Sequence, residues 1–579
     1  MNLKIPYGES NFKTVITGGY VYVDKTCYIP NLEENGKYLF LMRPRRFGKS
    51  LFLSMLEYYY DIAYRDEFDT LFGTLHIGRH PTPLHNSYPV LFMDFSGIDT
   101  DSGHDGIYAA FDRKIANALR RFLERYDYPL AAQQQIQDEI SPQSRLEAFL
   151  RILDNANQKF LLLIDEYDHF ANSILADDLQ LFQKIMGKGG FVRSFYKVLK
   201  TATQRGTLDR LFVTGVTPVM LDSMTSGFNI GVNLSLHEDF NEAVGFTEAE
   251  VITLLQPLAD VCPLSLEQLL GDARAWYNGY RFNLKAQTRV YNANMLLYFV
   301  KNFDRKRCEY PEPMLDENIA SDYGKIMKLF TIGNRDDNFA VLDELLNAGE
   351  VQATQRRKFE FDKGFDRNDF ISLIAYMGFT TLVRESLAGQ VFAIPNHVMR
   401  ELYFQYFKVE IERRNQITIS DRTLLLAVEK LGLYSDIQPL VAELERVLQL
   451  LSNRDSLYLD EEHIKTILLA LLYQSPAYFI LSEREMDKKY PDILLLERSP
   501  YKVNFQHLIE LKYCKKGDKQ AGWEAQKQKG ITQVEEYLQL PGIAALKNLS
   551  AWLLVTDTTR VEVIKVGQAS ADLGSVACA

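Results

Sequence analysis

The sequence predicts an α/β protein, with a parallel sheet near the N-terminus, a mainly helical middle and a second α/β domain near the C-terminus. Three observations support this fold class. Four short apolar runs in the first 220 residues alternate with amphipathic segments of helix length, as expected for strands buried on both faces of a parallel sheet. The stretch 245–299 has helical apolar spacing. Strand-like runs return at 478–497 and 503–518, after a helical stretch.

The length of 579 residues leaves room for about three to five domains. We expect four parts, and the changes in apolar pattern set their limits. They are a sheet domain at 1–240, a helical lid at 241–310, a helical or winged-helix-like region at 311–440 and a second α/β domain at 441–579.

The composition excludes several classes of protein. The first ten residues lack a basic-then-apolar signal pattern, and no run approaches the ~20 apolar residues that span a bilayer, so we expect a cytoplasmic protein without a membrane partner. The formal charge of −11 argues against a globally basic nucleic-acid-binding surface. The five cysteines are scattered without C-x-x-C spacing, which indicates neither a disulfide framework nor a zinc site.

The first apolar run, 38–42, leads into the sequence RPRRFGKS at 43–50, whose second half has the pattern of a phosphate-binding loop. Such a loop grips phosphate through backbone N–H groups at a helix N-terminus, a lysine and a hydroxyl ligand to Mg²⁺, and Gly48, Lys49 and Ser50 supply these groups. The usual opening glycine is replaced by Arg43, which is tolerated if φ stays negative there. With Arg45 and Arg46, it also brings positive charge towards a triphosphate. The alternative is a basic helix cap.

The third apolar run, 159–166, ends in Asp165 and Glu166. Two adjacent carboxylates after a buried strand are costly unless they project from its C-terminal edge into a site. Asp165 is expected to hold Mg²⁺ and Glu166 to polarise the attacking water. Thr214, in the last run at 208–216, is a weaker candidate to sense a γ-phosphate. A solvated strand end is the alternative for the acidic pair.

These motifs resemble the family of AAA-ATPase-like proteins that are coupled to a restriction-type nuclease domain. The resemblance extends to IPYGESNFKTVITGGYVYVDKT at 5–26, FVTGVTPVML, VGFTEAEV, WYNGYRF and VYNANMLLYF, and in this family the loop itself reads R-P-R-R-F-G-K-[ST]. The resemblance implies an ASCE-like P-loop NTPase sheet that binds ATP and Mg²⁺ through the residues named above.

The middle of the chain is less informative. In WYNGYRF, Arg281 is a candidate to reach the nucleotide from the helical lid, and the alternative is a guanidinium stacked on neighbouring aromatic rings. Residues 366–407 read as helix, short hairpin and helix, which suits a small winged-helix module. Because this segment lacks a clear Lys/Arg stripe, we favour packing over DNA contact.

The C-terminal part contains Asp492 at the start of one strand and Glu510-Leu511-Lys512 within the next. Period-2 geometry places Glu510 and Lys512 on one face. If Asp492 lies on a neighbouring hairpin strand, it can share one Mg²⁺ with Glu510, while Lys512 orients water and stabilises charge on the phosphate. A lone E-x-K is otherwise a solvated strand edge.

Flanking residues favour a catalytic interpretation of this pattern. A preceding helix offers Glu462, although Glu461 is the alternative, and a following helix places Gln533 and Tyr537 on one side. The ensemble resembles the PD-(D/E)xK nuclease core, which implies a restriction-endonuclease-like fold. The segment 512–529 adds six lysines against two acids, which is either a contact for a phosphodiester backbone or a solvated loop.

Two functions are compatible with these patterns. The first is an ATPase that regulates a Mg²⁺-dependent nuclease acting on nucleic acid, DNA rather than RNA, with a use in defence or mobile-element control suggested by the family resemblance alone. The second is an ATP-driven switch whose C-terminal domain binds nucleic acid or a partner without cutting it. A homo-oligomer is compatible with either function.

Overall fold

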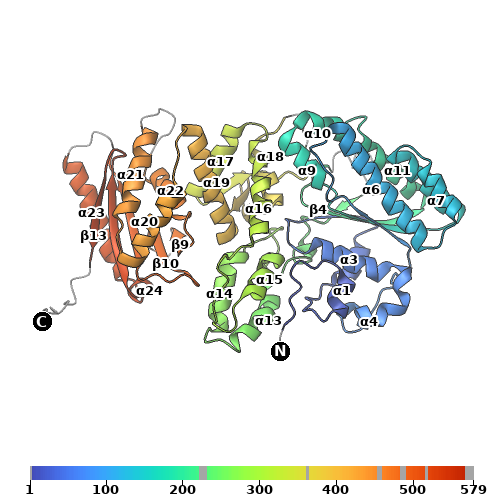
Figure 1. Cartoon of the computed structure of the whole chain (residues 1–579), viewed down its shortest axis with the longest axis horizontal. Coiled ribbons are helices and arrows are strands. Elements are labelled where there is room, and N and C mark those ends of the chain that lie inside the picture. Colours follow the sequence, from blue (N-terminus) through green and yellow to red (C-terminus); the bar gives the residue numbers. More distant parts are fainter. Residues whose placement is uncertain are drawn as a thin grey trace. The chain divides into compact units, whose positions relative to one another are not determined.

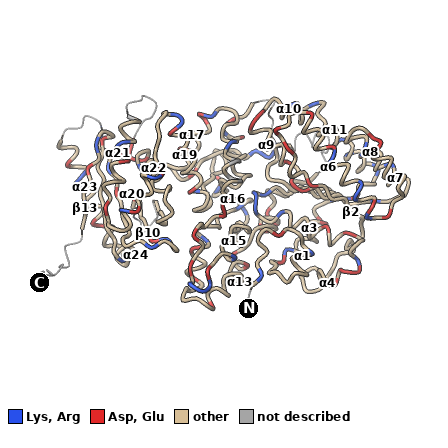
Figure 2. The backbone as a smooth tube through the Cα atoms, viewed as in Figure 1, with Lys and Arg blue, Asp and Glu red and all other residues tan. Residues whose placement is uncertain are grey.

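The computed structural model describes residues 3–220, 231–359, 361, 364–452, 460–482, 489, 491–515 and 520–567. The chain divides into two compact units. The first comprises Met1–Cys308 and Leu315–Met399, and the second comprises Glu309–Met314 and Arg400–Ala579. The second unit thus begins before the boundary at 440 that the sequence predicts. Figure 2 shows basic and acidic residues interspersed along the described chain.

The first unit is built on a five-stranded sheet with the order β2-β3-β4-β1-β5. All of its strand pairs are parallel. Its strands are β1 (Tyr38–Met42), β2 (Val90–Asp94), β3 (Phe160–Asp165), β4 (Leu208–Gly215) and β5 (Val232–Asn233). The four predicted apolar runs are therefore confirmed as strands, whereas the two-residue β5 is too short to leave an apolar run. Since β4 separates β1 from β3, the predicted ASCE-like order is confirmed.

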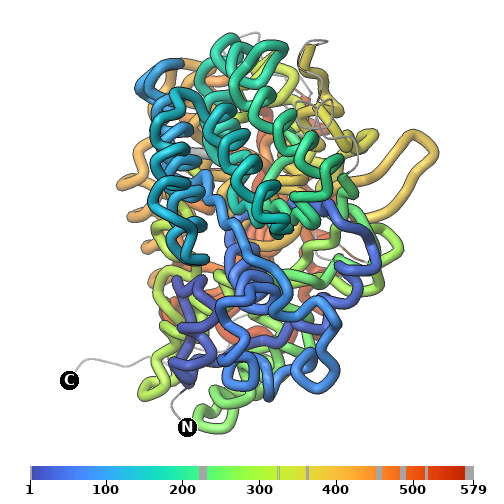
Figure 3. Tube along the Cα trace, turned by 90° about the vertical axis from the view of Figure 1, so that its right-hand side faces the viewer, coloured from blue at the N-terminus to red at the C-terminus, as the bar shows by residue number. Residues whose placement is uncertain are grey.

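Helices cover both faces of this sheet (Figure 1). The N-terminal ones are α1 (Phe12–Thr17), α2 (Tyr28–Glu34), α3 (Lys49–Tyr60), α4 (Phe68–Phe72) and α5 (His76–Arg79), with the 3-10 helix η1 (Ile62–Glu67). The following group is α6 (Gly103–Arg125), α7 (Leu130–Gln137), α8 (Pro142–Asn155), α9 (His169–Asp177), α10 (Leu179–Met186) and α11 (Phe191–Arg205). Figure 3 shows helices of this second group side by side in blue-green. Phe12, Leu53 and Leu163 belong to the fully buried core between α1, α3 and the sheet.

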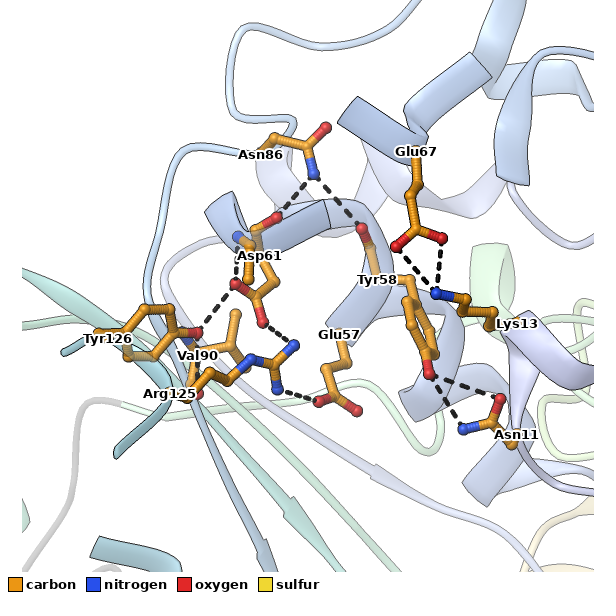
Figure 4. Close-up of polar contacts among 11 residues, drawn as sticks. Asn11, Lys13, Glu57, Tyr58, Asp61, Glu67, Asn86, Val90, Arg125 and Tyr126 are labelled. Carbon is orange, nitrogen blue, oxygen red and sulfur yellow. Dashed lines mark hydrogen bonds and ion pairs between the residues drawn. The ribbon is translucent and has the colours of Figure 1, made fainter. Parts of the chain in front are cut away.

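A buried polar network fixes the C-terminal end of α3 (Figure 4). The side chain of Asp61 is fully buried, and its Oδ2 lies 2.5 Å from Nη2 of Arg125 at the end of α6. Arg125 also lies 3.0 Å from Oε1 of Glu57, and the hydroxyl of Tyr126 donates to Oδ1 of Asp61 at 2.9 Å. The helix that begins at the predicted phosphate-binding loop is therefore anchored to α6 at its opposite end.

The rest of the first unit is mainly helical. Its elements are η2 (Glu238–Phe240), α13 (Glu248–Ala259), α14 (Leu266–Tyr277), α15 (Ala293–Asn302), α16 (Glu317–Ile326), η3 (Met327–Thr331), α17 (Arg335–Asn347), β6 (Glu350–Ala353), α18 (Arg367–Tyr376), β7 (Thr381–Ser386) and β8 (Gly389–Ala393). The strands form a three-stranded sheet of order β6-β8-β7, and α19 (His397–Asn415) follows it. The predicted order of helix, hairpin and helix at 366–407 is confirmed.

One disulfide corrects the cysteine prediction. Cys262 and Cys308 are bonded, with Cα atoms 5.5 Å apart and a sequence separation of 46. The pairing could not be recognised from the sequence because both cysteines lie in loops that only the tertiary fold brings together. Cys27 and Cys514 form no disulfide with another described residue, and Cys578 lies outside the described residues.

The second unit contains a mixed sheet with the order β13-β12-β11-β10-β9. Its elements after α19 are α20 (Asp421–Tyr434), α21 (Gln438–Ser452), α22 (Glu461–Leu472), β9 (Tyr478–Ser482), β10 (Ile493–Glu497), β11 (Gln506–Tyr513), α23 (Gln520–Leu538), α24 (Pro541–Ala544), β12 (Leu549–Thr556) and β13 (Val561–Val566). The β10–β11 pair is antiparallel, and β11 and β12 are parallel. The hairpin pairing that the sequence required between Asp492 and Glu510 is thus present. No helix among the described residues is both long and apolar enough to cross a bilayer.

Candidate functional site

The phosphate-binding loop lies where β1 gives way to α3. Gly48 is the N-cap of α3 and has a φ of 95°, a conformation that favours glycine. The backbone at Arg43 stays out of the positive-φ region, while Arg46 has a φ of 70°. The absent opening glycine is therefore no obstacle here, because the left-handed residues of the loop are its fourth and sixth.

A cavity of about 420 Å³ opens against this loop. This volume lies within the ~300–1,000 Å³ of typical small-molecule sites. The predicted site residues in its wall are Arg45, Arg46, Gly48, Lys49, Ser50 and Glu166. Much of the remaining wall is apolar and includes Val21, Val23, Val244, Phe246, Leu254 and Leu297. The cavity thus combines a phosphate-binding loop with an apolar surface suited to a planar base.

Lys49 and Glu166 line the same cavity, and the charge of Asp165 also acts on Lys49. Its side chain is buried, and its Nζ donates to the carbonyl of Pro44 at 3.0 Å. Burial lowers the pKa of Lys49, although the carboxylates of Glu166 and Asp165 oppose this shift. Among the described residues, the ammonium donates to this one carbonyl, which a phosphate oxygen can replace.

Asp165 and Glu166 take up different positions at the end of β3. Oδ1 of Asp165 accepts from the hydroxyl of Thr214 at 2.6 Å and from the N–H of Glu166 at 2.9 Å. No described residue donates to Oδ2, which leaves this oxygen for a cation or its water. Glu166 has a φ of 48° and lines the cavity, and its Oε2 lies 3.9 Å from Nε2 of His169. Burial raises the pKa of Glu166, with His169 and Lys49 acting in the opposite direction.

Two predicted cationic residues are not brought to the cavity. The guanidinium of Arg43 is buried, donates to the carbonyls of Met42, Ser235 and Phe240, and lies 4.0 Å from the ring centre of Phe282. These carbonyls hold the guanidinium under the loop. The expectation that Arg43 approaches a phosphate is therefore corrected. Arg281 donates to the carbonyls of Leu382 and Val383 in β7. It therefore packs on the hairpin instead of reaching towards the nucleotide.

Sequence reasoning missed two asparagines that fasten the loop. Asn292 caps α15 and donates through Nδ2 to the carbonyl of Arg45 at 3.2 Å. The backbone N–H of Asn294 donates to the carbonyl of Arg46 at 3.0 Å. The side chain of Asn294 lines the cavity, and its buried Oδ1 has no hydrogen-bond partner among the described residues. The motif VYNANMLLYF contains both residues, but a polar pair before a helix also fits simple capping.

The second site lies on β10 and β11 of the second unit. Nζ of Lys512 donates to Oε1 of Glu510 at 2.9 Å, and both side chains are buried. Oδ2 of Asp492 accepts from the N–H of Leu511 at 2.8 Å, and its own N–H faces Oε2 of Glu510 at 3.5 Å. The three predicted residues therefore converge on one part of the sheet.

Glu461 contributes from α22, where the sequence analysis favoured Glu462. Its Oε1 lies 3.3 Å from Nζ of Lys512, and its Oε2 accepts from the N–H of Tyr513 at 3.1 Å. Glu462 is exposed. Adjacent residues on a helix point about 100° apart, so only one of them can face the strand.

Burial is the largest single influence on the pKa values of the residues in this cluster. Burial and the neighbouring Asp492 raise the pKa of Glu510 to about 7. Burial also raises the pKa of Asp492, against the N–H of Leu511 and the charge of Lys512. Burial disfavours charge on Lys512, but Glu510, Glu461 and Asp492 outweigh it and raise its pKa. The two carboxyls are thus poised to lose a proton when a cation approaches.

Two remaining predictions concern α23 and the lysine-rich segment. Gln533 lies one turn before Tyr537, and its Oε1 is buried without a hydrogen-bond partner among the described residues. Burial and the charges of Glu510 and Asp492 raise the pKa of Tyr537 to about 12, so this helix faces the carboxyl cluster. Residues 516–519 of the lysine-rich segment lie outside the described residues.

Comparisons with known proteins match the two regions of the chain that contain these sites. Residues 6–225 match the family described as "Predicted AAA-ATPase", and residues 459–566 match the PD-(D/E)XK nuclease superfamily. An uncharacterized protein from the vnfD 5′ region of Azotobacter chroococcum mcd 1 is 29% identical over 301 residues. That alignment covers 52% of each chain, so this chain spans about half the length of the relative.

Solved structures with low similarity include Cdc6p from Pyrobaculum aerophilum and the ORC2 protein from Aeropyrum pernix. The first has a TM-score of 0.25, 10% identity and coverage of 69% of this chain and 98% of that one. The second has a TM-score of 0.30, 10% identity and coverage of 71% and 97%. The fold assignment rests on the strand order and on the two matched regions. The chain therefore contains a domain of the predicted AAA-ATPase family at residues 6–225 and a domain of the PD-(D/E)XK nuclease superfamily at residues 459–566.

Proposed function

We propose that the first unit binds and hydrolyses ATP, and that its nucleotide state regulates a Mg²⁺-dependent nuclease in the second unit. The observation that carries the ATPase is the single cavity that unites Lys49 and Ser50 of the loop with Glu166 of β3. The nuclease proposal rests on the contact of Lys512 with Glu510 beside Asp492. The substrate is nucleic acid, DNA rather than RNA, and the family suggests a use in defence or mobile-element control.

The residues of the first unit fit ATP and magnesium. The first residues of α3 line the cavity, and the N–H groups at a helix start favour a phosphate beside them. Ser50 and the open oxygen of Asp165 would hold Mg²⁺, which when bound neutralises phosphate charge. Lys49 would exchange the carbonyl of Pro44 for a phosphate oxygen. Glu166 would accept a proton from the attacking water, and its raised pKa brings its basicity closer to that task.

The carboxyl cluster of the second unit fits a cation because Asp492 and Glu510 repel each other when both are ionised. These two residues would hold Mg²⁺, which when bound polarises a phosphodiester. Lys512 then loses part of its attraction to Glu510 and can donate to the phosphate. Glu461 orients Lys512 from α22.

A binding switch without cleavage is the second candidate function. It is favoured by one observation: Nζ of Lys512 already donates to Glu510, to Glu461 and to the carbonyl of Leu511, so it is engaged within the protein. In this case the second unit would bind nucleic acid or a partner through its lysines and a bound cation, and it would not cleave the bound molecule.

Incubation of the full chain with single- and double-stranded DNA and RNA tests both functions, with Mg²⁺ or Mn²⁺ and with or without ATP. Lys512→Ala should slow cutting by about 10²–10³-fold, because it removes a preorganised charge at the reacting phosphate. Nucleic-acid affinity and ATP hydrolysis should stay at the wild-type level. Lys502→Ala, an exposed lysine of the same unit, serves as the control. If the wild type cuts nothing and Lys512→Ala changes only affinity, the binding switch is the correct function.

A further inference from the structure

A second cleft of the first unit, with a volume of about 720 Å³, has no role in the function proposed above. One wall is the N-terminal segment from Leu3 to Glu9 together with Tyr20. The other is the end of α15 and the loop that follows it, from Val300 to Lys306. Both walls belong to the same compact unit.

The cleft carries more positive than negative charge, although the whole chain is acidic. Lys4, Lys301, Arg305 and Lys306 line it. In the described part of the chain, no carboxylate lies within 4.0 Å of any of these four cationic groups. Nζ of Lys4 donates to the carbonyl of Gly18 at 2.9 Å, which leaves its charge in place, so the four positive charges can attract an anion from solution.

The two acidic residues of the cleft are already engaged by the backbone. Oδ1 of Asp304 accepts from the N–H of Lys306 at 2.9 Å and of Arg307 at 3.1 Å. Oε1 of Glu9 accepts from the N–H of Asn11 at 2.8 Å. These hydrogen bonds hold the carboxylates in their own loops, and the four cations that line the cleft outnumber its two carboxylates.

Tyrosine rings lie among these cations. Nζ of Lys4 lies 4.0 Å from the ring centre of Tyr20, and Nζ of Lys301 lies 5.0 Å from that of Tyr7. Tyr7 is itself fixed by a hydrogen bond to Asp316 and by a ring contact with Tyr298 at 5.6 Å. Rigid aromatic rings between lysines are the pattern of surfaces that bind single-stranded nucleic acid, whose phosphates meet cations while its bases stack.

The basic loop is also held in shape. The turn around Asp304 is closed by the two hydrogen bonds described above, and the disulfide between Cys308 and Cys262 ties its end to the loop after α13. A loop ordered before binding loses little conformational entropy when a ligand arrives.

We propose that this cleft binds a single strand of nucleic acid through its phosphates, with Lys4, Lys301, Arg305 and Lys306 as contacts and Tyr7 and Tyr20 as stacking surfaces. A flexible strand can follow such a concave cleft, whereas a stiff duplex cannot bend into it. The proposal does not depend on cutting by the second unit, and it assigns nucleic-acid contact to the unit that holds the nucleotide cavity.

The cleft also shares a wall with the nucleotide cavity. Gly8 and Glu9 line both of them. A strand seated in the cleft therefore contacts the same short segment that borders the phosphate-binding loop.

The test uses the full chain and combines a measurement of strand binding with mapping of the residues that contact the strand. A fluorescent 20-nucleotide poly-dT strand is titrated by anisotropy at several salt concentrations, without divalent cations. Replacing Lys301, Arg305 and Lys306 by glutamine should reduce the slope of log K against log[salt] by about 2, because each phosphate contact to a single strand contributes about 0.7. Photo-crosslinking of a 4-thiothymidine strand, read by mass spectrometry, should place crosslinks in residues 3–20 and 298–307. Parallel titrations with an oligo-U strand and with a duplex show whether the protein distinguishes RNA from DNA and single strands from double strands.

The matched control replaces Arg113 and Arg121, two exposed cations of α6, by glutamine and should leave the slope unchanged. An unchanged slope in the Lys301, Arg305 and Lys306 variant, or crosslinks confined to the second unit, would overturn the proposal. An equal reduction of the slope in the control variant would also overturn it. The same holds if the cleft binds anionic phosphatidylserine vesicles but not the strand. Because neither readout requires cleavage, failure of the nuclease and failure of the cleft are distinguishable.

Discussion

At the scale of single residues, the carboxyl of Glu510 is sensitive to pH near neutrality because its pKa is raised to about 7. Burial and Asp492 raise its pKa from 4.5 to about 7. A raised carboxyl pKa favours the folded state most at pH values below 4.5, and this contribution is lost as the pH rises through about 7. A bound cation reverses the balance, because it stabilises the ionised carboxylate.

The first prediction follows from this competition between a proton and a cation. Mn²⁺ affinity of the second unit, measured by isothermal titration calorimetry on the full chain, should rise about tenfold between pH 6 and pH 8, since binding must displace the proton of Glu510. Glu510→Gln should bind weakly at both pH values. Glu497→Gln, on the exposed end of β10, is the control. A wild-type affinity that is independent of pH would show that Glu510 is not a ligand.

The second prediction concerns Lys49. Lys49→Ala should weaken ATP binding by at least about 30-fold, because loss of one buried charged contact costs about 2 kcal/mol or more. Competition with a fluorescent ATP analogue measures the change. Lys37→Ala removes a lysine whose side chain is 53% exposed at the other end of the same strand and should have little effect. Equal affinities for wild type and Lys49→Ala would refute the phosphate-loop assignment.

The third prediction separates binding from chemistry at Glu166. Glu166→Gln should still bind ATP but hydrolyse it about 10²–10⁴-fold more slowly, because an amide fills the same space without accepting a proton. Single-turnover hydrolysis measures the chemical step directly. Asp105→Asn, at an exposed position of α6, should behave like wild type. Unchanged turnover in Glu166→Gln would make this residue a strand-end carboxylate without a catalytic role.

The sequence predicted residue types at the sites better than residue orientations. Lys49, Glu166, Glu510 and Lys512 lie where strand and loop geometry place them. Arg43 does not, because the nearest acceptors for its guanidinium are carbonyls under the loop. The choice of Glu462 over Glu461 depended on the rotation of α22, which tertiary packing sets and a single sequence does not reveal.

At the scale of elements, the length and apolar content of buried strands made them predictable. The four runs of the parallel sheet correspond to β1–β4 within two residues at each end. Short or composite features were not predictable, because β5 has only two residues and the disulfide joins loops far apart in sequence. The fastening of the loop by Asn292 likewise depends on contacts between distant segments.

The fourth prediction concerns the network at the end of α3 (Figure 4). Arg125→Ala should destabilise the region around α3 by about 3–5 kcal/mol, since it leaves the carboxylate of Asp61 buried without its cation. Hydrogen exchange of peptides from α3 and α6 measures this locally and does not require two-state unfolding. Lys13→Ala breaks a half-exposed ion pair with Glu67 and should cost at most about 1 kcal/mol. Equal protection in the two variants would contradict the role of the network.

At the scale of the whole molecule, the proposed regulation requires that changes at one site alter activity at the other. As a fifth prediction, Lys49→Ala should abolish the response of cutting to ATP, whereas Lys512→Ala should abolish cutting and leave ATP hydrolysis intact. Parallel assays of phosphate release and strand cleavage on both variants measure the two effects. Cutting that responds to ATP equally in wild type and Lys49→Ala would show that the first unit does not regulate the second.

The wall formed by Gly8 and Glu9 has a thermodynamic consequence for the first unit. The free energy of the state with both cavities filled does not depend on the order of filling. If a strand in the basic cleft tightens ATP binding by some factor, ATP must tighten strand binding by the same factor. One coupling free energy thus describes both directions, and a protein that senses a strand through its ATP affinity must also release that strand more readily once the nucleotide has left.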